Sequence, residues 1–198
     1  MAGRRPHHRP RDRSVECELK FRVASPRDHA RLRALLHKRE ARLEGKYDEE
    51  NFRFHGPGKS TRRTTLRLRV LDGGPRGVLT AKGPANFVRG VKVREETEVE
   101  VKDAHATLDL LAELGFQVEF TYKKHREMWT LDGVVTVTLD TLAFGSFVEL
   151  EGPLEILPEQ ARSLDLDPKT SLRDSYSVLA RKHLAATRKK TANSTSAA

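Results

Sequence analysis

Two short runs of alternating charged residues could do chemistry by their type and spacing. Glu16, Glu18 and Lys20 recur at every second position, as do Glu149 and Glu151. Because the side chains of a strand alternate between its two faces, each run would place its charges on one face. Two such runs on neighbouring strands would gather four carboxylates, and like charges directly opposite destabilise a sheet. A divalent cation would remove this repulsion, and hard oxygen ligands select Mg²⁺ or Mn²⁺.

Basic residues alternate in the same way along other segments that resemble strands. On these segments acids and bases share one face, and few Ser, Asn or Gln residues dilute the charge. The shared face contains the bases Arg67, Arg69, Lys82, Arg94, Lys124 and Arg126, the acids Glu96, Glu98 and Asp140, and Thr138.

This alternation has two interpretations. A sheet with one solvated face would show the same pattern, and that is the common arrangement for antiparallel strands. If the sheet instead closes with its charged face inward, the interior is a polar tunnel in which unpaired charge would be very unfavourable. A polyphosphate bound together with Mg²⁺ or Mn²⁺ would satisfy both signs of charge.

Strands and helices that would position these residues follow from hydrophobic periodicity and turn signals. Strands are predicted at 15–23, 46–54, 65–71, 77–82, 91–101, 117–131, 134–140 and 144–151. Helices are predicted at 26–39, 104–114, 158–164 and 171–186. About eight strands joined mostly by short turns predict an α+β fold. Its sheet is expected to close into an eight-stranded antiparallel β-barrel with a polar interior and flanking helices.

The basic character of the chain belongs mostly to its two ends. Of the net charge of +9, residues 1–13 carry +4 and residues 187–198 carry +3, which leaves +2 for residues 14–186. Both ends have the composition of disordered segments, so one folded domain is expected over 14–186. Nucleic-acid binding is therefore not expected of the domain, and only weak contact with a phosphate backbone through the tails is left open.

Cysteine content and hydropathy restrict the compartment. The single Cys17 rules out a disulfide framework and suits a reducing cytoplasm. No apolar run approaches the roughly 20 residues needed to cross a bilayer, so no membrane association is expected. The basic N-terminal segment lacks the apolar stretch of a secretory signal.

The ordered set of motifs resembles the CYTH superfamily, the triphosphate tunnel metalloenzymes. The first motif, Glu16-x-Glu18-x-Lys20-Phe21, is similar to the family's ExExK signature. The remaining motifs follow in the family's order across about residues 14–186. They are Leu66-Arg67-Leu68-Arg69, Thr80-Ala81-Lys82-Gly83-Pro84, Arg94-Glu95-Glu96-Thr97-Glu98, Lys124-His125-Arg126, Leu139-Asp140, Gly145-Ser146-Phe147-Val148-Glu149-Leu150-Glu151 and Ser175-Tyr176.

The resemblance implies an eight-stranded tunnel that binds a triphosphate and two metal ions. It implies that the metal ligands are Glu16, Glu18, Glu149 and Glu151, with Asp140 and Glu98 close by. The implied phosphate-binding residues are Lys20, Arg67, Arg69, Lys82, Arg94, Lys124 and Arg126. Catalysis is expected to depend on Glu16, Glu18, Lys20, Glu149 and Glu151. Tyr176 is expected either to contact substrate or to support the closing helix.

Three functions remain open. The first is a metal-dependent phosphohydrolase that cleaves a phosphoanhydride of inorganic triphosphate or of a small organic or nucleoside triphosphate. The second is a class IV adenylyl cyclase that converts ATP to cyclic AMP and pyrophosphate; the wording of the motifs is similar to the cyclase and thiamine-triphosphatase branch. The third is a non-enzymatic phosphate- or RNA-binding protein, which would gain nothing from clustered carboxylates.

Overall fold

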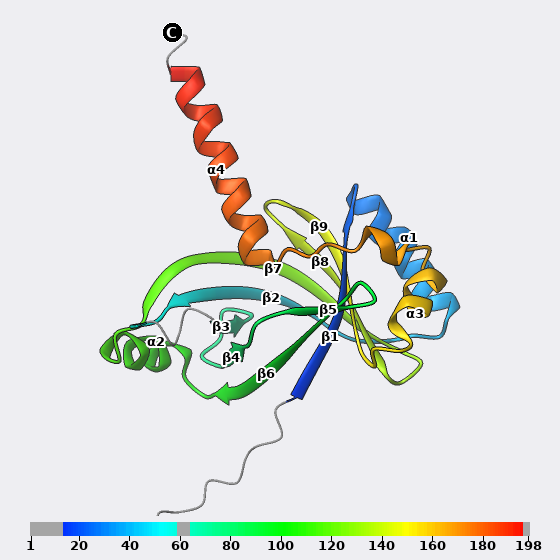
Figure 1. Cartoon of the computed structure of the whole chain (residues 1–198), viewed down its shortest axis with the longest axis horizontal. Coiled ribbons are helices and arrows are strands. Elements are labelled where there is room, and N and C mark those ends of the chain that lie inside the picture. The colour runs from blue at the N-terminus through cyan, green and yellow to red at the C-terminus, as the bar shows by residue number, and fades with distance from the viewer. Residues whose placement is uncertain (1–13, 59–63, 196–198) are drawn as a thin grey trace, which may run out of the picture.

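The computed structural model describes residues 14–58 and 64–195, and it shows a closed barrel of antiparallel strands (Figure 1). The barrel consists of β1 (Ser14–Val23), β2 (Arg42–His55), β3 (Thr65–Leu71), β4 (Gly77–Lys82), β6 (Val91–Val101), β7 (Gln117–Leu131), β8 (Val135–Leu142) and β9 (Gly145–Glu151). Their order around the barrel is β1-β9-β8-β7-β2-β3-β4-β6, and β6 pairs again with β1. The predicted α+β fold with a closed eight-stranded barrel is therefore confirmed.

A short additional strand, β5 (Asn86–Val88), was not predicted. It pairs antiparallel with the first residues of β6 and is joined to it by Arg89 and Gly90. Both turn residues have positive φ, 51° and 85°, which matches the twist of a tight hairpin. An arginine rarely adopts this left-handed conformation. Of the two turn residues, only Gly90 is therefore of the type that would predict a turn from the sequence.

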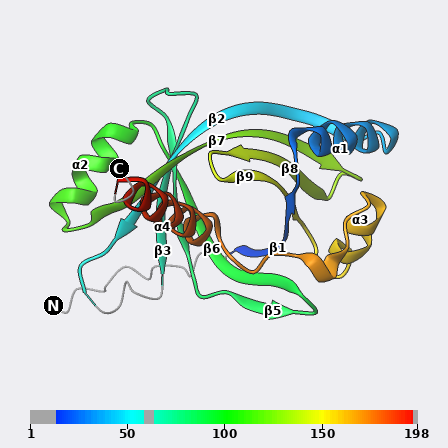
Figure 2. The same cartoon turned by 90° about the horizontal axis from the view of Figure 1, so that it is seen from above.

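Helices lie at opposite ends of the barrel (Figure 2). They are α1 (Pro26–Lys38), α2 (Ala104–Glu113), α3 (Leu157–Ser163), the 3-10 turn η2 (Pro168–Thr170) and α4 (Tyr176–Thr195). In both views α1 and α3 lie together at one end, α2 lies at the other, and α4 projects outward from the barrel. Each helix was predicted within a few residues of its bounds except α4.

Helix α4 begins and ends later than expected. It starts at Tyr176 rather than at 171, and it continues to Thr195 rather than ending at 186. The sequence predicts disorder over 187–198, but the Ala, Lys and Arg residues there also have high helix propensity. The other segment expected to be disordered, residues 1–13, lies outside the described residues.

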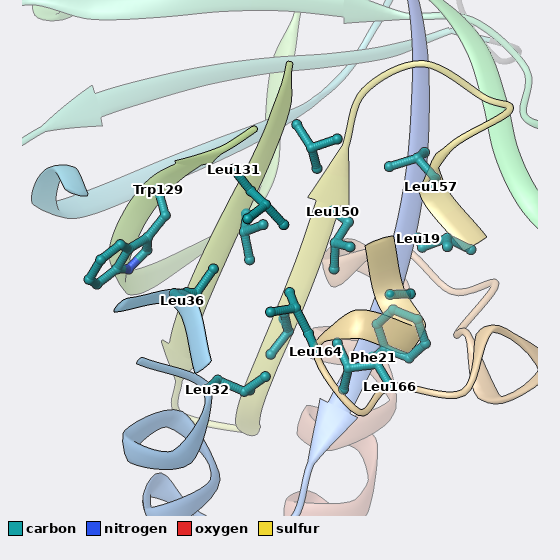
Figure 3. Close-up of a cluster of buried hydrophobic side chains, with 14 of the residues drawn as sticks. Leu19, Phe21, Leu32, Leu36, Trp129, Leu131, Leu150, Leu157, Leu164 and Leu166 are labelled. Atoms are coloured by element: carbon teal, nitrogen blue, oxygen red, sulfur yellow. The ribbon is translucent and has the colours of Figure 1, made fainter. Parts of the chain in front are cut away.

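The main apolar core lies outside the barrel wall (Figure 3). There α1 and α3 pack on the outer faces of β1, β7, β8 and β9. The buried core residues include Leu19, Phe21, Leu32, Leu36, Trp129, Leu131, Leu150, Leu157 and Leu164. Because this core uses the outward side chains of each strand, alternation directs the charged side chains into the barrel.

A second set of apolar contacts attaches α4 to the barrel. Tyr176 and Leu179 pack against Leu142 and Phe147, and Phe144 packs beside them. Phe147 lies on the same face of β9 as Glu149 and Glu151, which is the inner face. The first turn of α4 therefore enters the barrel and covers part of its interior.

Candidate active site in the barrel interior

A cavity of about 450 Å³ lies inside the barrel, and charged side chains dominate its lining. All but one of the predicted site residues line it, and the exception is Asp140. The lining contains the bases Lys20, Arg67, Arg69, Lys82, Arg94, Lys124 and Arg126 and the acids Glu16, Glu18, Glu96, Glu98, Glu149 and Glu151. The structure thus brings together residues that are up to 135 positions apart in the sequence, from Glu16 to Glu151.

The register of β1 explains how its three charged residues meet their partners. Glu16 lies opposite Arg94 on β6, whereas Lys20 lies opposite Glu149 on β9. Glu18 lies opposite Glu151, so these two carboxylates are cross-strand neighbours. Such a pair of like charges is unfavourable unless cations compensate it.

Glu16 is held by two basic side chains. Its Oε1 lies 2.8 Å from Lys82 Nζ, and its Oε2 lies 2.7 Å from Arg94 Nε. Burial alone would raise the pKa of Glu16, but the charges of Lys82 and Arg94 outweigh it and lower the pKa well below the usual range. Glu16 is therefore ionised at neutral pH.

Lys20 connects the two acidic runs. Its Nζ lies 2.8 Å from Glu18 Oε1 and 3.0 Å from Glu149 Oε1, and its side chain is buried. Burial would lower the pKa of Lys20, but the two carboxylates raise it above its ordinary value. The ring of Tyr176 lies 4.4 Å from the same ammonium and adds a cation–π contact.

Arg126 forms the second centre of the charge network. It contacts both oxygens of Asp140, and its Nη2 also lies 2.6 Å from Glu149 Oε2. Asp140 is fully buried behind the cavity surface and accepts a further hydrogen bond from the Tyr176 hydroxyl at 2.7 Å. In this arrangement Asp140 orients the Arg126 guanidinium.

Glu151 differs from the other acids of the cavity. Its side chain makes no hydrogen bond or ion pair with any residue of 14–58 or 64–195. Burial, followed by the charges of Glu149 and Glu16, raises its pKa to about 7. A carboxylate in this position lacks a cationic partner.

Glu98 lies on a more open part of the lining. It accepts a hydrogen bond from Thr80 at 2.8 Å and lies within 3.8 Å of both Arg67 and Arg69. Its side chain is 43% exposed, against 7% for Glu149. Its close partners are thus arginines rather than the acids with which it was predicted to bind metal.

Three charged residues of the network were not among the predicted site residues. Glu49 lies 3.2 Å from Lys124 and 3.6 Å from Arg69; burial opposes its ionisation, but these cations lower its pKa to about 2. Glu96 lies 2.7 Å from Lys82, yet burial raises its pKa to about 7. Lys92 lies 3.2 Å from Glu18, and burial lowers its pKa. Alternation of Glu49 with Asn51 and Arg53 was the signal that could have identified Glu49.

Comparison with known proteins shows which family combines these features. The family model described as "CYTH domain" matches residues 14–163. The chain belongs to the CYTH family. This match begins at the first residue of β1 and includes every predicted site residue, from Glu16 to Glu151.

Individual CYTH relatives and solved structures are similar over most of their length. The Methanocaldococcus jannaschii protein named "Putative adenylate cyclase MJ0240" is 26% identical over 151 residues, which is 76% of this chain and 84% of the relative. The structure of the PH1819 protein from Pyrococcus horikoshii has a TM-score of 0.70 at 26% identity and covers 85% of this chain and 99% of that one. The Hippeastrum protein HpAC1 has a TM-score of 0.59 at 20% identity, covering 76% and 88%. That protein is described as a "putative adenylyl cyclase" with a dominant triphosphatase activity, and at this identity the likeness shows the fold alone.

The donor chemistry of the CYTH cavity suits a divalent cation, although no site is preformed. Within the described part of the chain, no three His, Cys, Asp or Glu side chains are grouped so that they could hold a metal ion. Most of the acids face basic side chains instead. Glu151 is the exception, because its half-buried carboxylate has no ion-pair partner among the described residues and faces the charges of Glu149 and Glu16. An oxygen donor of this kind fits Mg²⁺ or Mn²⁺.

The described residues also bear on membrane association. Among them, no helix combines the length and the apolar character that a membrane span requires.

Proposed function

We propose that this CYTH protein is a divalent-metal-dependent phosphohydrolase that cleaves a phosphoanhydride of a triphosphate bound inside the barrel. The substrate would be inorganic triphosphate or a small organic or nucleoside triphosphate. The proposal rests chiefly on one observation, the cavity in which seven basic and six acidic side chains face one another. The main apolar core lies on the outside of the wall, so these charged residues do not belong to it.

The basic set suits a short chain of phosphates. Arg67, Arg69, Arg94 and Arg126 can each offer two donors to a phosphate, whereas the lysines act as point charges. Few apolar side chains line the cavity, which leaves little surface for recognition of a large organic group. The phosphate chain would therefore supply most of the binding energy.

The acidic set suits the cations that accompany a triphosphate. Glu16, Glu18, Glu149 and Glu151 would hold Mg²⁺ or Mn²⁺, with Glu98 on the more open part of the lining. Asp140 was expected to lie close to the metal, but both its oxygens bind Arg126, so it would act only through that guanidinium. When bound, such an ion neutralises charge on the phosphates and lowers the pKa of a bound water. Phosphoryl transfer depends mainly on positioning and charge neutralisation, which the residues of this cavity can supply.

Protein groups would orient the substrate without covalent chemistry. Asp140 and Glu149 fix the Arg126 guanidinium, and the ring of Tyr176, which also lines the cavity, contacts the Lys20 ammonium. These cations would bind the non-bridging oxygens and favour the charge that develops on the leaving phosphate. Attack by water on the terminal phosphorus then gives hydrolysis.

A second candidate function, adenylyl cyclase, is favoured by the name of the Methanocaldococcus jannaschii relative. In that reaction the 3′-hydroxyl of ATP loses its proton and attacks the α-phosphorus, the bond from the α-phosphorus to the bridging oxygen breaks, and pyrophosphate leaves, which yields cyclic AMP. The same cations and acids would serve, so the two reactions differ in which part of ATP lies beside the metal.

Product analysis separates these functions. The full chain is incubated with Mg²⁺ or Mn²⁺ and with either inorganic triphosphate or ATP, and phosphorus NMR identifies the products. Orthophosphate together with a diphosphate supports the hydrolase. Cyclic AMP with pyrophosphate overturns it in favour of the cyclase, and no turnover with either metal excludes both and leaves a phosphate-binding protein.

A further inference from the structure

Lys92 is a buried cation that belongs to the charge network but not to the cavity wall. It lies on β6 directly opposite Glu18, and Glu18 lies directly opposite Glu151 on β9. The three side chains therefore form one row across adjacent strands and point to the same face. Lys92 is only 5% exposed, and its Nζ lies 3.2 Å from Glu18 Oε2. Among the described residues that line the cavity, Lys92 does not appear.

This position separates Lys92 from the other buried lysines of the barrel. Lys20, Lys82 and Lys124 all line the cavity, where they can reach a bound phosphate. Lys92 instead contacts Glu18 and does not line the cavity, so its charge acts on that acid rather than on the substrate. Alternation along 91–101 places Lys92 on the charged face with Arg94, Glu96 and Glu98, but none of the motifs quoted above contains it.

The row places one positive charge beside Glu18, whose neighbour on the other side is Glu151. Glu18 already interacts with Lys20 at 2.8 Å, so that Lys92 supplies a second cation to it, whereas Glu151 has no ion-pair partner among the described residues. A fixed positive charge at this distance repels a divalent cation that binds the same acids, and the repulsion is strong in a buried site. Lys92 would also prevent the empty barrel from carrying an uncompensated Glu18–Glu151 pair.

We propose that Lys92 is a positioning residue that acts through Glu18 as a built-in counter-ion, weakening divalent-cation binding to the Glu18–Glu151 pair. It thereby sets the metal concentration at which the barrel becomes loaded. The inference rests on the proposed function, because it requires these acids to bind metal. The inference predicts a distinctive direction of change in metal affinity. Removal of Lys92 strengthens metal binding, whereas loss of a merely structural contact would weaken metal binding or leave it unchanged.

Direct Mn²⁺ titration tests this inference without any substrate. Free Mn²⁺ is followed by its electron paramagnetic resonance signal in the presence of the full chain, and two neutral variants are compared with the wild type. Lys92→Met retains the length of the side chain without charge, and Lys92→Gln retains a hydrogen-bond donor toward Glu18. Lys92→Arg is the matched control, since it keeps the charge. Thermal melting checks that each variant is folded.

The expected result is a Kd for Mn²⁺ at least about tenfold lower in a folded neutral variant, with Lys92→Arg within about threefold of the wild type. An unchanged or weaker affinity for Mn²⁺ in a folded neutral variant overturns the inference. If Lys92→Met does not fold, the comparison uses Lys92→Gln, which preserves a hydrogen bond to Glu18. Glu151→Gln distinguishes this failure from failure of the proposed function. If Glu151→Gln loses Mn²⁺ binding while the neutral Lys92 variants do not change it, only the counter-ion role fails. If the wild type does not bind Mn²⁺, both fail.

Discussion

Asp140 and Arg126 form a buried two-point ion pair, with Nε 2.7 Å from Oδ1 and Nη2 2.6 Å from Oδ2. The two residues face each other across β8 and β7, and Asp140 is fully buried while Arg126 reaches the cavity. Because both oxygens of Asp140 are engaged, the guanidinium has one fixed orientation. Its remaining donor capacity points toward Glu149 and the cavity.

Asp140→Asn should therefore impair the positioning of the Arg126 guanidinium more than it impairs folding. The amide keeps one acceptor for Arg126 but removes the charge, and we expect kcat/KM for triphosphate to fall about 100-fold, the scale of a small misplacement of a binding group. Steady-state kinetics measure the effect. The matched control is Asp165→Asn, which removes an ion pair with Arg31 whose two side chains are at least half exposed. Equal activity of Asp140→Asn and wild type would contradict the role assigned to Asp140.

Glu16 and Glu149 should be needed for turnover. Substitution of either by Gln keeps the size of the side chain and removes the charge, and we expect turnover to fall at least about 100-fold, as for loss of a key electrostatic contact in the transition state. The assay is release of orthophosphate with Mg²⁺ or Mn²⁺. Glu50→Gln is the control, because among the residues that the structure describes the Glu50 carboxylate pairs only with the exposed Lys123, at 3.8 Å. Near-normal activity in both test variants would mean that the metal site lies elsewhere.

Strand faces could be predicted from the sequence because alternation has only two outcomes. In β1 the apolar residues Leu19 and Phe21 enter the outer core, which leaves Glu18 and Lys20 facing inward. The same logic placed the charged residues of the other strands. The closed barrel followed from the number of strands and their short connections.

Partners across strands could not be predicted in the same way. Alternation assigns a face but not a register, so that the contact of Lys92 with Glu18 and that of Glu49 with Lys124 appear only in the structure. Alternation also does not predict how deeply a side chain on the inner face is buried. Asp140 alternates with the site residues, yet its neighbours cover it and turn it toward Arg126 and Tyr176.

Tyr176 should act as a support for the cavity rather than as a group that touches substrate. Its hydroxyl donates a hydrogen bond to Asp140, and its ring lies 4.4 Å from Lys20 Nζ and 5.3 Å from Lys124 Nζ. Tyr176→Phe removes only the hydroxyl, and we expect about 1 kcal/mol less stability and less than about a tenfold loss of activity.

Tyr176→Leu removes the ring as well and serves as the comparison. Each lysine would lose a cation–π contact of about 0.5–2 kcal/mol, so KM should rise beyond that of Tyr176→Phe. Kinetics and urea unfolding of the two variants, measured side by side, check the difference. Complete loss of turnover in Tyr176→Phe, with stability near that of wild type, would instead place the hydroxyl on the substrate.

The metal-free protein should become more stable as the pH falls from 8 to 5. The pKa of Glu151 is raised to about 7 in the folded state from its ordinary value of 4.5, so the folded state binds a proton that the unfolded state releases. The resulting stabilisation is fully present below about pH 4.5 and is lost as the pH rises through 7; by linkage it is about 3 kcal/mol. Glu96 titrates in the same window and acts in the same direction, whereas His29, whose pKa is lowered by burial, acts in the opposite direction.

Glu151→Gln should reduce this pH dependence, because Gln cannot ionise. Urea unfolding at pH 5, 6.5 and 8 without metal measures the free energy of unfolding, and we expect Glu151→Gln to exceed the wild type at pH 8 and to approach it at pH 5. Mg²⁺ or Mn²⁺ should raise the stability of the wild type at pH 8, since a cation that binds only the folded state stabilises it. The same ions should have a smaller effect on Glu151→Gln. Identical pH profiles for the two proteins would show that Glu151 is not the strained carboxylate of the empty barrel.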